Sequence, residues 1–192
     1  MTKNRLIVGV SGASGMTYAD RLIHRAVEAG LEVHLVVSRA AKMTIAYELG
    51  EGFAFEGPAQ TYGIADVGAP IASGSFKTVG MVVVPCSVRT MSEIATGVTS
   101  SLLTRAADVC LKERRPLVLM VRETPLHLGH LRSMTALAEM GAIIAPPLPA
   151  FYAEPQNVEE IVDQSVGRVL DLFGVEAAGV RRWGEDLEKG RR

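Results

Sequence analysis

One stretch near the start of the chain limits the possible folds more than any other, Arg5-Leu-Ile-Val-Gly-Val-Ser-Gly-Ala-Ser-Gly15. Its apolar run from Leu6 to Val10 predicts a buried strand, and a helical pattern begins at Met16 after a loop of small residues. The loop glycines permit a sharp turn or a close approach to a ligand. Backbone N–H groups at a helix start, beside the hydroxyls of Ser11 and Ser14, suit a phosphate. The stretch therefore predicts the opening of a nucleotide-binding α/β unit.

This loop departs from the dinucleotide fingerprint G-x-G-x-x-G, because its glycines fall at positions 9, 12 and 15. For the loop alone, a phosphate cradle and a tight connection without a ligand both remain open. A second loop, Pro85-Cys-Ser-Val-Arg-Thr90, repeats the design after the apolar run 79–84. Since the carboxyl ends of parallel strands meet at one sheet edge, where ligands bind, two such loops favour a phosphate or cofactor site.

Apolar strands alternate with helical patterns along the rest of the chain, which is typical of an α/β protein with a parallel sheet. We expect Pro85 to end the strand 79–84, and residues 50–78 to be irregular, with a short hidden element or a functional loop. The length of 192 residues predicts one domain, 1–192, with a polar tail at 174–192. Further strands are expected at 31–37, 116–121 and 142–145, and helices at 18–29, 40–49, 100–114, 128–140 and 157–173.

Composition argues against several classes of function. A net charge of −1 and an aromatic content of 5% speak against a nucleic-acid-binding module. Cys86 and Cys110 form no metal-binding pattern, so we expect two reduced thiols in a cytoplasmic protein. His127 and His130 have no carboxylate partner at metal-ligand spacing, and no metal is expected. We also expect no signal peptide and no membrane span, because no apolar run is long enough.

Polar residues at the predicted strand and helix ends are the candidates for chemistry. Arg122 and Glu123 directly follow a buried strand, where they form either a salt-bridged terminus or part of a site. Glu48 lies near a helix C-terminus, where a carboxylate is unfavourable, so it is a solvated surface acid or a functional one. Tyr152 follows the proline-rich loop 146–149 at the end of the last strand.

Several segments, in this order and spacing, resemble those of the flavin prenyltransferases of the UbiX family. The likeness extends from Leu6 to Trp183 and is closest to the bacterial members of the ubiquinone pathway. The segments that carry it are Ser11-Gly-Ala-Ser-Gly15, Ser73-Gly-Ser-Phe76, Pro85-Cys-Ser87, Arg105-Ala-Ala-Asp108, Lys112-Glu-Arg-Arg-Pro116, Val121-Arg-Glu-Thr-Pro-Leu-His-Leu-Gly-His-Leu131 and Pro146-Pro-Leu-Pro-Ala-Phe-Tyr152.

The resemblance implies a flavodoxin-like Rossmann fold, with a parallel sheet flanked by helices on both faces. It implies a homo-dodecamer with active sites at subunit contacts. The implied reaction joins a dimethylallyl group from dimethylallyl monophosphate to N5 and C6 of reduced FMN and releases phosphate, without a metal. The product, prenylated FMN, serves UbiD-type decarboxylases in ubiquinone biosynthesis or aromatic acid metabolism. Two alternatives remain: a carrier that binds FMN without turnover, and a flavin-dependent decarboxylase of cysteine derivatives or aromatic acids.

Site residues follow from the resemblance position by position. Those expected to bind FMN are Gly12, Ala13, Ser14, Ser38, Ser87, Val88, Arg89, Thr90 and Arg122. Those expected at the prenyl phosphate are Tyr152, Arg168, Lys112, Trp183 and Arg105, and those expected in catalysis are Glu48, Lys112 and Glu123.

The chemistry of these side chains suits the implied reaction. Lys112, Arg122 and Arg168 offer positive charge to a departing phosphate. Glu123 is the candidate acid that protonates the phosphate, and Glu48 the candidate base for the proton lost at C6. The rings of Tyr152 and Trp183 suit a cation-like prenyl fragment, and the proline-rich loop and the tail suit a lid that excludes water.

Overall fold

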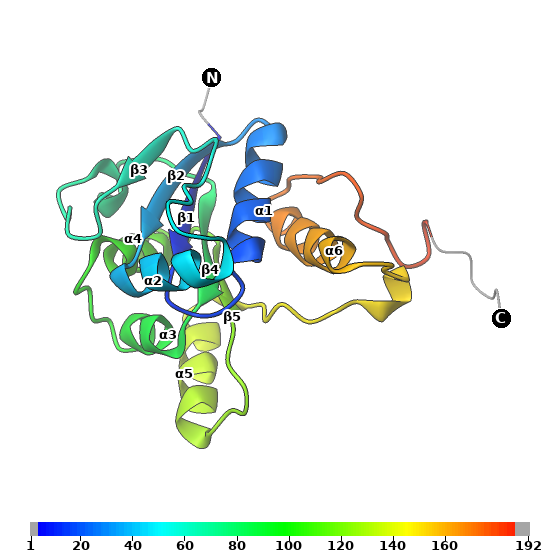
Figure 1. Cartoon of the computed structure of the whole chain (residues 1–192). Coiled ribbons are helices and arrows are strands. Elements are labelled where there is room, and N and C mark those ends of the chain that lie inside the picture. Colours follow the sequence, from blue (N-terminus) through cyan, green and yellow to red (C-terminus); the bar gives the residue numbers. More distant parts are fainter. Residues whose placement is uncertain (1–3, 187–192) are drawn as a thin grey trace.

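A six-stranded parallel sheet forms the centre of the molecule, which a computed structural model describes for residues 4–186. The strand order is β3-β2-β1-β4-β5-β6, and helices cover both faces (Figure 1). The strands are β1 (Arg5–Val10), β2 (Glu32–Val37), β3 (Gln60–Tyr62), β4 (Gly80–Cys86), β5 (Leu117–Val121) and β6 (Ile143–Ile144). Residues 187–192, the end of the expected tail, and residues 1–3 lie outside the described part.

Two groups of helices sandwich the sheet. Residues of α1, α2 and α6 share one hydrophobic cluster, and residues of α3, α4 and α5 share the other. In Figure 1, α5 projects below the sheet, and α6 with the segment after β6 extends to the right. The helices are α1 (Met16–Glu28), α2 (Arg39–Glu48), α3 (Val88–Ala95), α4 (Leu102–Lys112), α5 (Leu128–Glu139) and α6 (Val158–Asp171), with 3₁₀ turns η1 (Pro70–Ala72) and η2 (Phe151–Ala153).

Successive residues of the central strands point to opposite faces, as the two-residue period of a strand requires. In β1, Leu6 and Val8 pack against α1 and α6, and Ile7 packs on the other side with Met81 of β4. Both faces are buried, which explains why these strands read as continuous apolar runs in the sequence. The expected α/β fold is confirmed.

Strand β1 lies at the switch point of the sheet. The chain proceeds from β1 through β2 to β3 on one side, and then crosses to β4, β5 and β6 on the other. Without the three-residue edge strand β3, the order is the flavodoxin-like one. Loops that leave β1 and β4 in opposite directions open a crevice at the carboxyl ends of the strands, which is where both small-residue loops lie.

One sequence-based element needs correction, and one expected short element is found. Pro85 does not end the third predicted strand but lies inside β4, which continues to Cys86. The ladder between β4 and β5 shifts register between Val83 and Cys86, and this irregularity accommodates a residue that has no N–H to donate. The stretch 50–78 contains β3, which pairs with β2, and the turn η1. Within residues 4–186, no helix is both long and apolar enough to cross a membrane.

One buried hydroxyl joins the two loops of the switch point. Ser11, which is fully buried, donates from Oγ to the carbonyl of Pro85 at 3.0 Å and accepts from the N–H of Ser87 at 2.8 Å. Its own N–H donates to the same Pro85 carbonyl at 3.2 Å. The end of β1 and the start of α3 are therefore held in a fixed relation.

Substitution of Ser11 by alanine tests this connection. Ser11→Ala leaves the partly buried N–H of Ser87 without its acceptor, which costs about 1–3 kcal/mol of unfolding free energy. We expect a lower urea midpoint with an unchanged slope, because the start of α3 loses a contact to the end of β1. An unchanged midpoint would show that the hydroxyl does not hold the two loops together.

Candidate functional site

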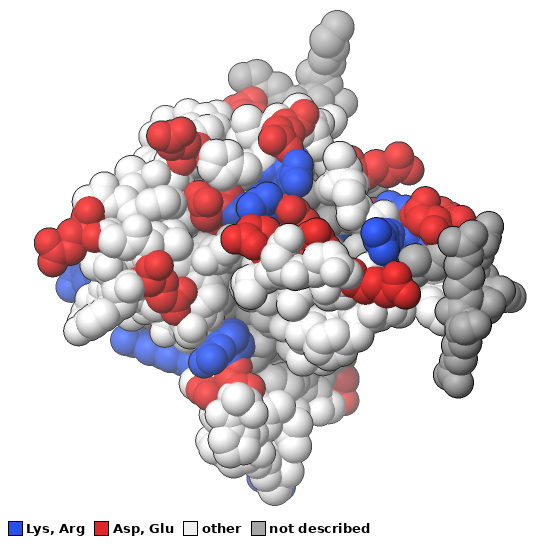
Figure 2. Space-filling model, turned by 45° about the vertical axis from the view of Figure 1, so that its right-hand side comes forward, with Lys and Arg blue, Asp and Glu red and all other residues white. Residues whose placement is uncertain are grey.

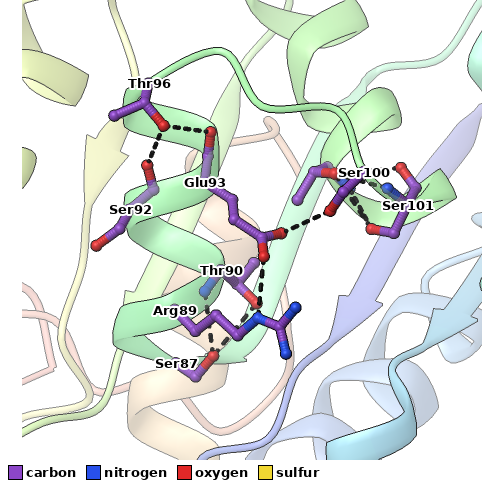
Figure 3. A network of polar contacts seen from close by, with 9 residues as sticks. Ser87, Arg89, Thr90, Ser92, Glu93, Thr96, Ser100 and Ser101 are labelled. Carbon is purple, nitrogen blue, oxygen red and sulfur yellow. Dashed lines mark hydrogen bonds and ion pairs between the residues drawn. The ribbon is translucent and has the colours of Figure 1, made fainter.

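Three helices begin around one cavity of about 430 Å³ at the carboxyl edge of the sheet. Each carries a serine as its N-cap, and each cap lines the cavity. Ser38 Oγ accepts from the N–H of Ala41 at 3.1 Å. Ser87 and Ser101, which Figure 3 shows, make the equivalent bonds at 3.3 Å. Helix N-termini carry partial positive charge and free N–H groups. Their convergence suits an anion such as a phosphate monoester.

Charged side chains frame this cavity. Arg39 and Arg89 line it beside the helix starts, and Arg89 Nε donates to Glu93 at 2.9 Å. The second carboxylate oxygen of Glu93 accepts from the hydroxyl of Ser100 at 3.2 Å. Figure 3 shows that Glu93 thereby joins α3 to the segment that leads into α4. The cavity wall at this end is consequently a connected polar network.

A second cavity of about 380 Å³ continues the first, because Gly12, Ala40, Ser87 and Arg89 line both. A side chain at position 12 would place its Cβ 2.4 Å from the Cβ of Ala40, so only glycine allows the first loop to approach α2 this closely. The second cavity adds residues from the loops after β1, β4 and β5: Ala13, Ser14, Val88, Arg122 and Glu123. Both cavities together form one crevice, and they bring all nine expected flavin-binding residues together.

Glu48 caps the helix start that the sequence offered as a possible phosphate cradle. Its carboxylate accepts from the N–H of Met16 at 2.7 Å and from that of Gly15 at 2.9 Å. These two N–H groups therefore already have an acceptor within the chain. The sequence-based objection to Glu48 also disappears, because its carboxylate lies at the N-terminus of α1 and not on the dipole of its own helix.

The surroundings of Glu48 keep it ionised. Partial burial raises its pKa, but hydrogen bonds from Met16, Ser14 and Gly15 and the charge of Arg122 outweigh this and hold the pKa below its usual range. Within residues 4–186, Glu123 accepts a hydrogen bond from the N–H of Thr124 at 3.0 Å and makes no ion pair with Arg122. The strand-end pair is thus not a salt-bridged terminus, and both side chains face the crevice.

Three further predicted residues lie beyond β6. Arg168 of α6 lines a separate cavity of about 190 Å³ with the proline-rich loop, and its guanidinium contacts Asp171 at 2.5 Å. The rings of Tyr152 and Trp183 meet edge-on, with centroids 5.7 Å apart. Neither cavity of the crevice includes any of these residues.

Lys112 and Arg105 lie elsewhere again, on α4. Lys112 is the last residue of that helix and forms an ion pair with Glu113, just before the chain enters β5 at its amino end. The N-terminus of α4 lines the crevice, so Lys112 lies about 15 Å along the helix from it. Arg105 donates to Asp108 at 2.6 Å and to the carbonyl of Ala72 at 3.3 Å. Within one chain, the predicted site residues therefore lie in three separate places: the crevice, α4 and the part of the chain beyond β6.

Sequence reasoning missed several cavity residues. Ser101 was not selected, although it forms a capping box with Thr104, a spacing that marks a helix start. Arg39 and Glu93 carry no motif, and only the fold reveals their place. His127 caps α5 through Nδ1, which accepts from the N–H of Gly129 at 3.0 Å. Within the described residues, no group of three His, Cys, Asp or Glu could hold a metal.

The capping role of Glu48 predicts a pH-dependent stability. Because its folded pKa is lowered, the carboxylate stabilises the fold above its unfolded pKa, and this contribution disappears as the pH falls through the folded value. We expect Glu48→Gln to lower the Tm at neutral pH and to match the parent protein in strong acid. Thermal unfolding followed by circular dichroism measures both, with the exposed neighbour Glu51→Gln as the control. An equal loss at both pH values would contradict this assignment.

The chain is similar to proteins that are named as flavoproteins or flavin prenyltransferases. The family model for flavoproteins matches residues 1–170. A flavin prenyltransferase UbiX of Thauera aromatica is 50% identical over 187 residues, 96% of each chain. A crystal structure of AnUbiX (PadA1) with FMN and dimethylallyl pyrophosphate has a TM-score of 0.91 at 41% identity, and covers 95% of this chain and 98% of its own.

A dodecameric FMN-dependent UbiX-like decarboxylase from Escherichia coli O157:H7 has a TM-score of 0.88 at 44% identity, with 93% of this chain and 98% of that chain covered. Sequence and structure comparisons thus extend over nearly the whole chain, well beyond the loops of the crevice. The likeness that the sequence motifs indicated is confirmed. The chain belongs to the UbiX family of flavin prenyltransferases, within the flavoproteins.

Proposed function

We propose that this chain transfers a dimethylallyl group from dimethylallyl monophosphate to N5 and C6 of reduced FMN, and releases phosphate. One observation carries the proposal: a continuous crevice has helix N-termini at one end and Arg122 and Glu123 at the other, where Glu48 interacts with the lining residues Ser14 and Arg122. The first end suits the phosphate of FMN, and the second offers groups for proton transfer and charge stabilisation. The relatives' names and the ligands of AnUbiX support the same reaction.

The crevice implies a direction for the bound flavin. The FMN phosphate would lie at the N-termini of α2, α3 and α4, with Ser38, Ser87 and Thr90 beside it. The ring system would extend into the second cavity along Ala13, Ser14, Val88 and Arg122, with Gly12 and Arg89 at the junction. The reactive edge of the ring would then lie on the side of Glu48 and Glu123. Bound FMN supplies the nucleophilic N5 and C6 atoms.

The two carboxylates are suited to different steps. Glu123 has no cation bound to it in the described residues, and we propose that it protonates the departing phosphate. Glu48 stays ionised, and we propose that it accepts the proton that C6 would lose when the second bond forms. A lowered pKa makes it a weak base, which suffices because loss of this proton would restore the aromatic ring. The alkene carbon beside the new bond would gain a proton in the same closure, and the proton lost from N5 would balance the one that Glu123 gives to the phosphate. Arg122 and Lys112 stabilise the negative charge that develops on the phosphate.

Completion of the site requires more than one copy of the chain. Lys112, Arg105, Tyr152, Arg168 and Trp183 lie outside the crevice, and we propose that neighbouring copies bring them to it as the groups that hold dimethylallyl monophosphate. Arg168 would exchange Asp171 for the substrate phosphate. Such a contact between non-identical surfaces is how a closed oligomer builds a shared site.

Helix α5 supports assembly into the homo-dodecamer that its structural relative forms. Leu128 and Leu131 are exposed, and Leu137 is the buried residue of this helix. The projection that α5 forms at the bottom of the molecule carries few charged side chains, whereas charges of both signs are mixed over the body (Figure 2). A projection with few charges and with exposed leucines fits a surface covered by another copy. We further propose a cytoplasmic enzyme whose product passes to a UbiD-type decarboxylase, in ubiquinone biosynthesis or aromatic acid metabolism.

Two substitutions test the catalytic assignments. Glu123→Gln removes the proposed acid and Lys112→Ala removes a proposed phosphate partner, while neither lies where the FMN phosphate would bind. We expect both variants to retain FMN, with its unchanged ultraviolet–visible spectrum, and to form prenylated FMN at least about a hundredfold more slowly. Mass spectrometry of the flavin after incubation with reduced FMN and dimethylallyl monophosphate measures the product.

The exposed residues Glu56 and Lys42 provide matched controls. Glu56→Gln and Lys42→Ala make the same changes in charge, and both should form product at the parent rate. Full turnover by Glu123→Gln or Lys112→Ala removes that residue from the mechanism. Flavin that binds to the parent protein but keeps its mass indicates a carrier, and release of CO₂ from a cysteine derivative or an aromatic acid by this chain alone indicates a decarboxylase.

A further inference from the structure

A buried glutamine in α6 connects three parts of the chain. Gln164 is 4% exposed, and its amide pairs with the backbone of Arg181 in both directions. Nε2 donates to the Arg181 carbonyl at 2.9 Å, and Oε1 accepts from the Arg181 N–H at 2.9 Å. Nε2 also lies 3.4 Å from the hydroxyl oxygen of Tyr152. The same amide thus contacts the C-terminal tail and the residue that we place at the prenyl phosphate.

Close packing next to Gln164 holds the tail against α6. A side chain at Gly167 would place its Cβ 2.0 Å from Cγ2 of Val180, so the tail rests directly on the helix backbone. Two arginine side chains of the tail make further contacts. Arg182 pairs with both oxygens of Asp171 at 2.9 Å, and Arg181 donates to the carbonyl of Ala153 at 3.0 Å.

We propose that Gln164 is a positioning residue for the prenyl phosphate. It holds Tyr152, and the tail that carries Trp183, in fixed positions relative to Arg168. This inference rests on the proposed function. Gln164 and Arg168 are one helical turn apart and line the same cavity, so they present their side chains to one side of α6. Because the rings of Tyr152 and Trp183 are in edge-on contact, a shift of the tail also displaces Tyr152.

Only a carboxamide can make this connection. It donates and accepts from one planar group, so it pairs with an N–H and a C=O of the same backbone residue. Leucine offers neither function. Glutamate keeps the acceptor but faces the Arg181 carbonyl with a second oxygen and buries a charge, which is unfavourable. Gln164 therefore selects one register of the tail on α6.

Two variants release the tail by different routes. Gln164→Leu removes the amide, and Gly167→Ala keeps the amide but displaces Val180. Alanine favours a helix more than glycine does, so Gly167→Ala leaves α6 itself stable. For both variants we expect the KM for dimethylallyl monophosphate to rise by about tenfold, the loss expected when a buried hydrogen-bonding partner is removed, with the Kd for FMN unchanged.

Two measurements report directly whether the tail is released in the assembled protein. Trp183 is the one tryptophan of the chain, so its fluorescence should change in both variants. Trypsin should cleave faster after Arg181 and Arg182, which the intact contacts hold against α6. Val180→Ala serves as the matched control, and the double variant Gly167→Ala/Val180→Ala should recover a low KM, because it removes the methyl group that collides.

The outcomes separate the inference from the proposed function. If the tail is released but the KM for dimethylallyl monophosphate stays at the parent value, Gln164 has no positioning role. If the Kd for FMN weakens as much as the KM rises, the effect is a general loss of structure, which also overturns the inference. If the parent protein forms no prenylated FMN, the proposed function fails first and the positioning role with it.

Discussion

The meeting of three helix N-termini at one edge of the sheet is the constraint on which the rest of the structure depends. A parallel sheet delivers the starts of its crossover helices to the carboxyl ends of its strands, and the switch at β1 separates the loops there into a crevice. Ser11 fixes the β1 end to the start of α3, and Gly12 lets the first loop approach α2. The end of the crevice that suits an anion thus follows from backbone geometry more than from any single side chain.

Much of this could be predicted from the sequence, and the failures have physical causes. Continuous apolar runs identified the central strands, because a doubly covered parallel sheet buries both faces. Pro85 was misassigned because a local shift in register, invisible in the sequence, accommodates it inside β4. Glu48 was misjudged as unfavourable because its acceptor role depends on the start of α1, which lies more than thirty residues earlier in the chain. Ser101 carried a readable capping signal, whereas Arg39 and Glu93 carried none.

The site residues lie in three separate places in one chain, so the proposed oligomer would be needed to bring them together. The crevice holds the groups expected for flavin, while α4 and α6 carry the expected cations on other surfaces. Reaction of a cation-like prenyl fragment requires exclusion of water, and in the proposed assembly the neighbouring copies would close the open crevice. Gln164 fits the same account, since a phosphate-binding arm that acts on a neighbour must be held rigid by its own chain.

Mixed oligomers test the central claim, that each site combines residues of different copies, most directly. Glu123→Gln and Lys112→Ala chains, each inactive alone, are unfolded, combined in equal amounts and reassembled, and native mass spectrometry confirms mixing. If Glu123 and Lys112 of one site come from different copies, on the order of a quarter of the sites regain both residues, and prenylated FMN appears at that fraction of the parent rate. Mixed oligomers that form no product would contradict the account, because every site would then draw both residues from one chain.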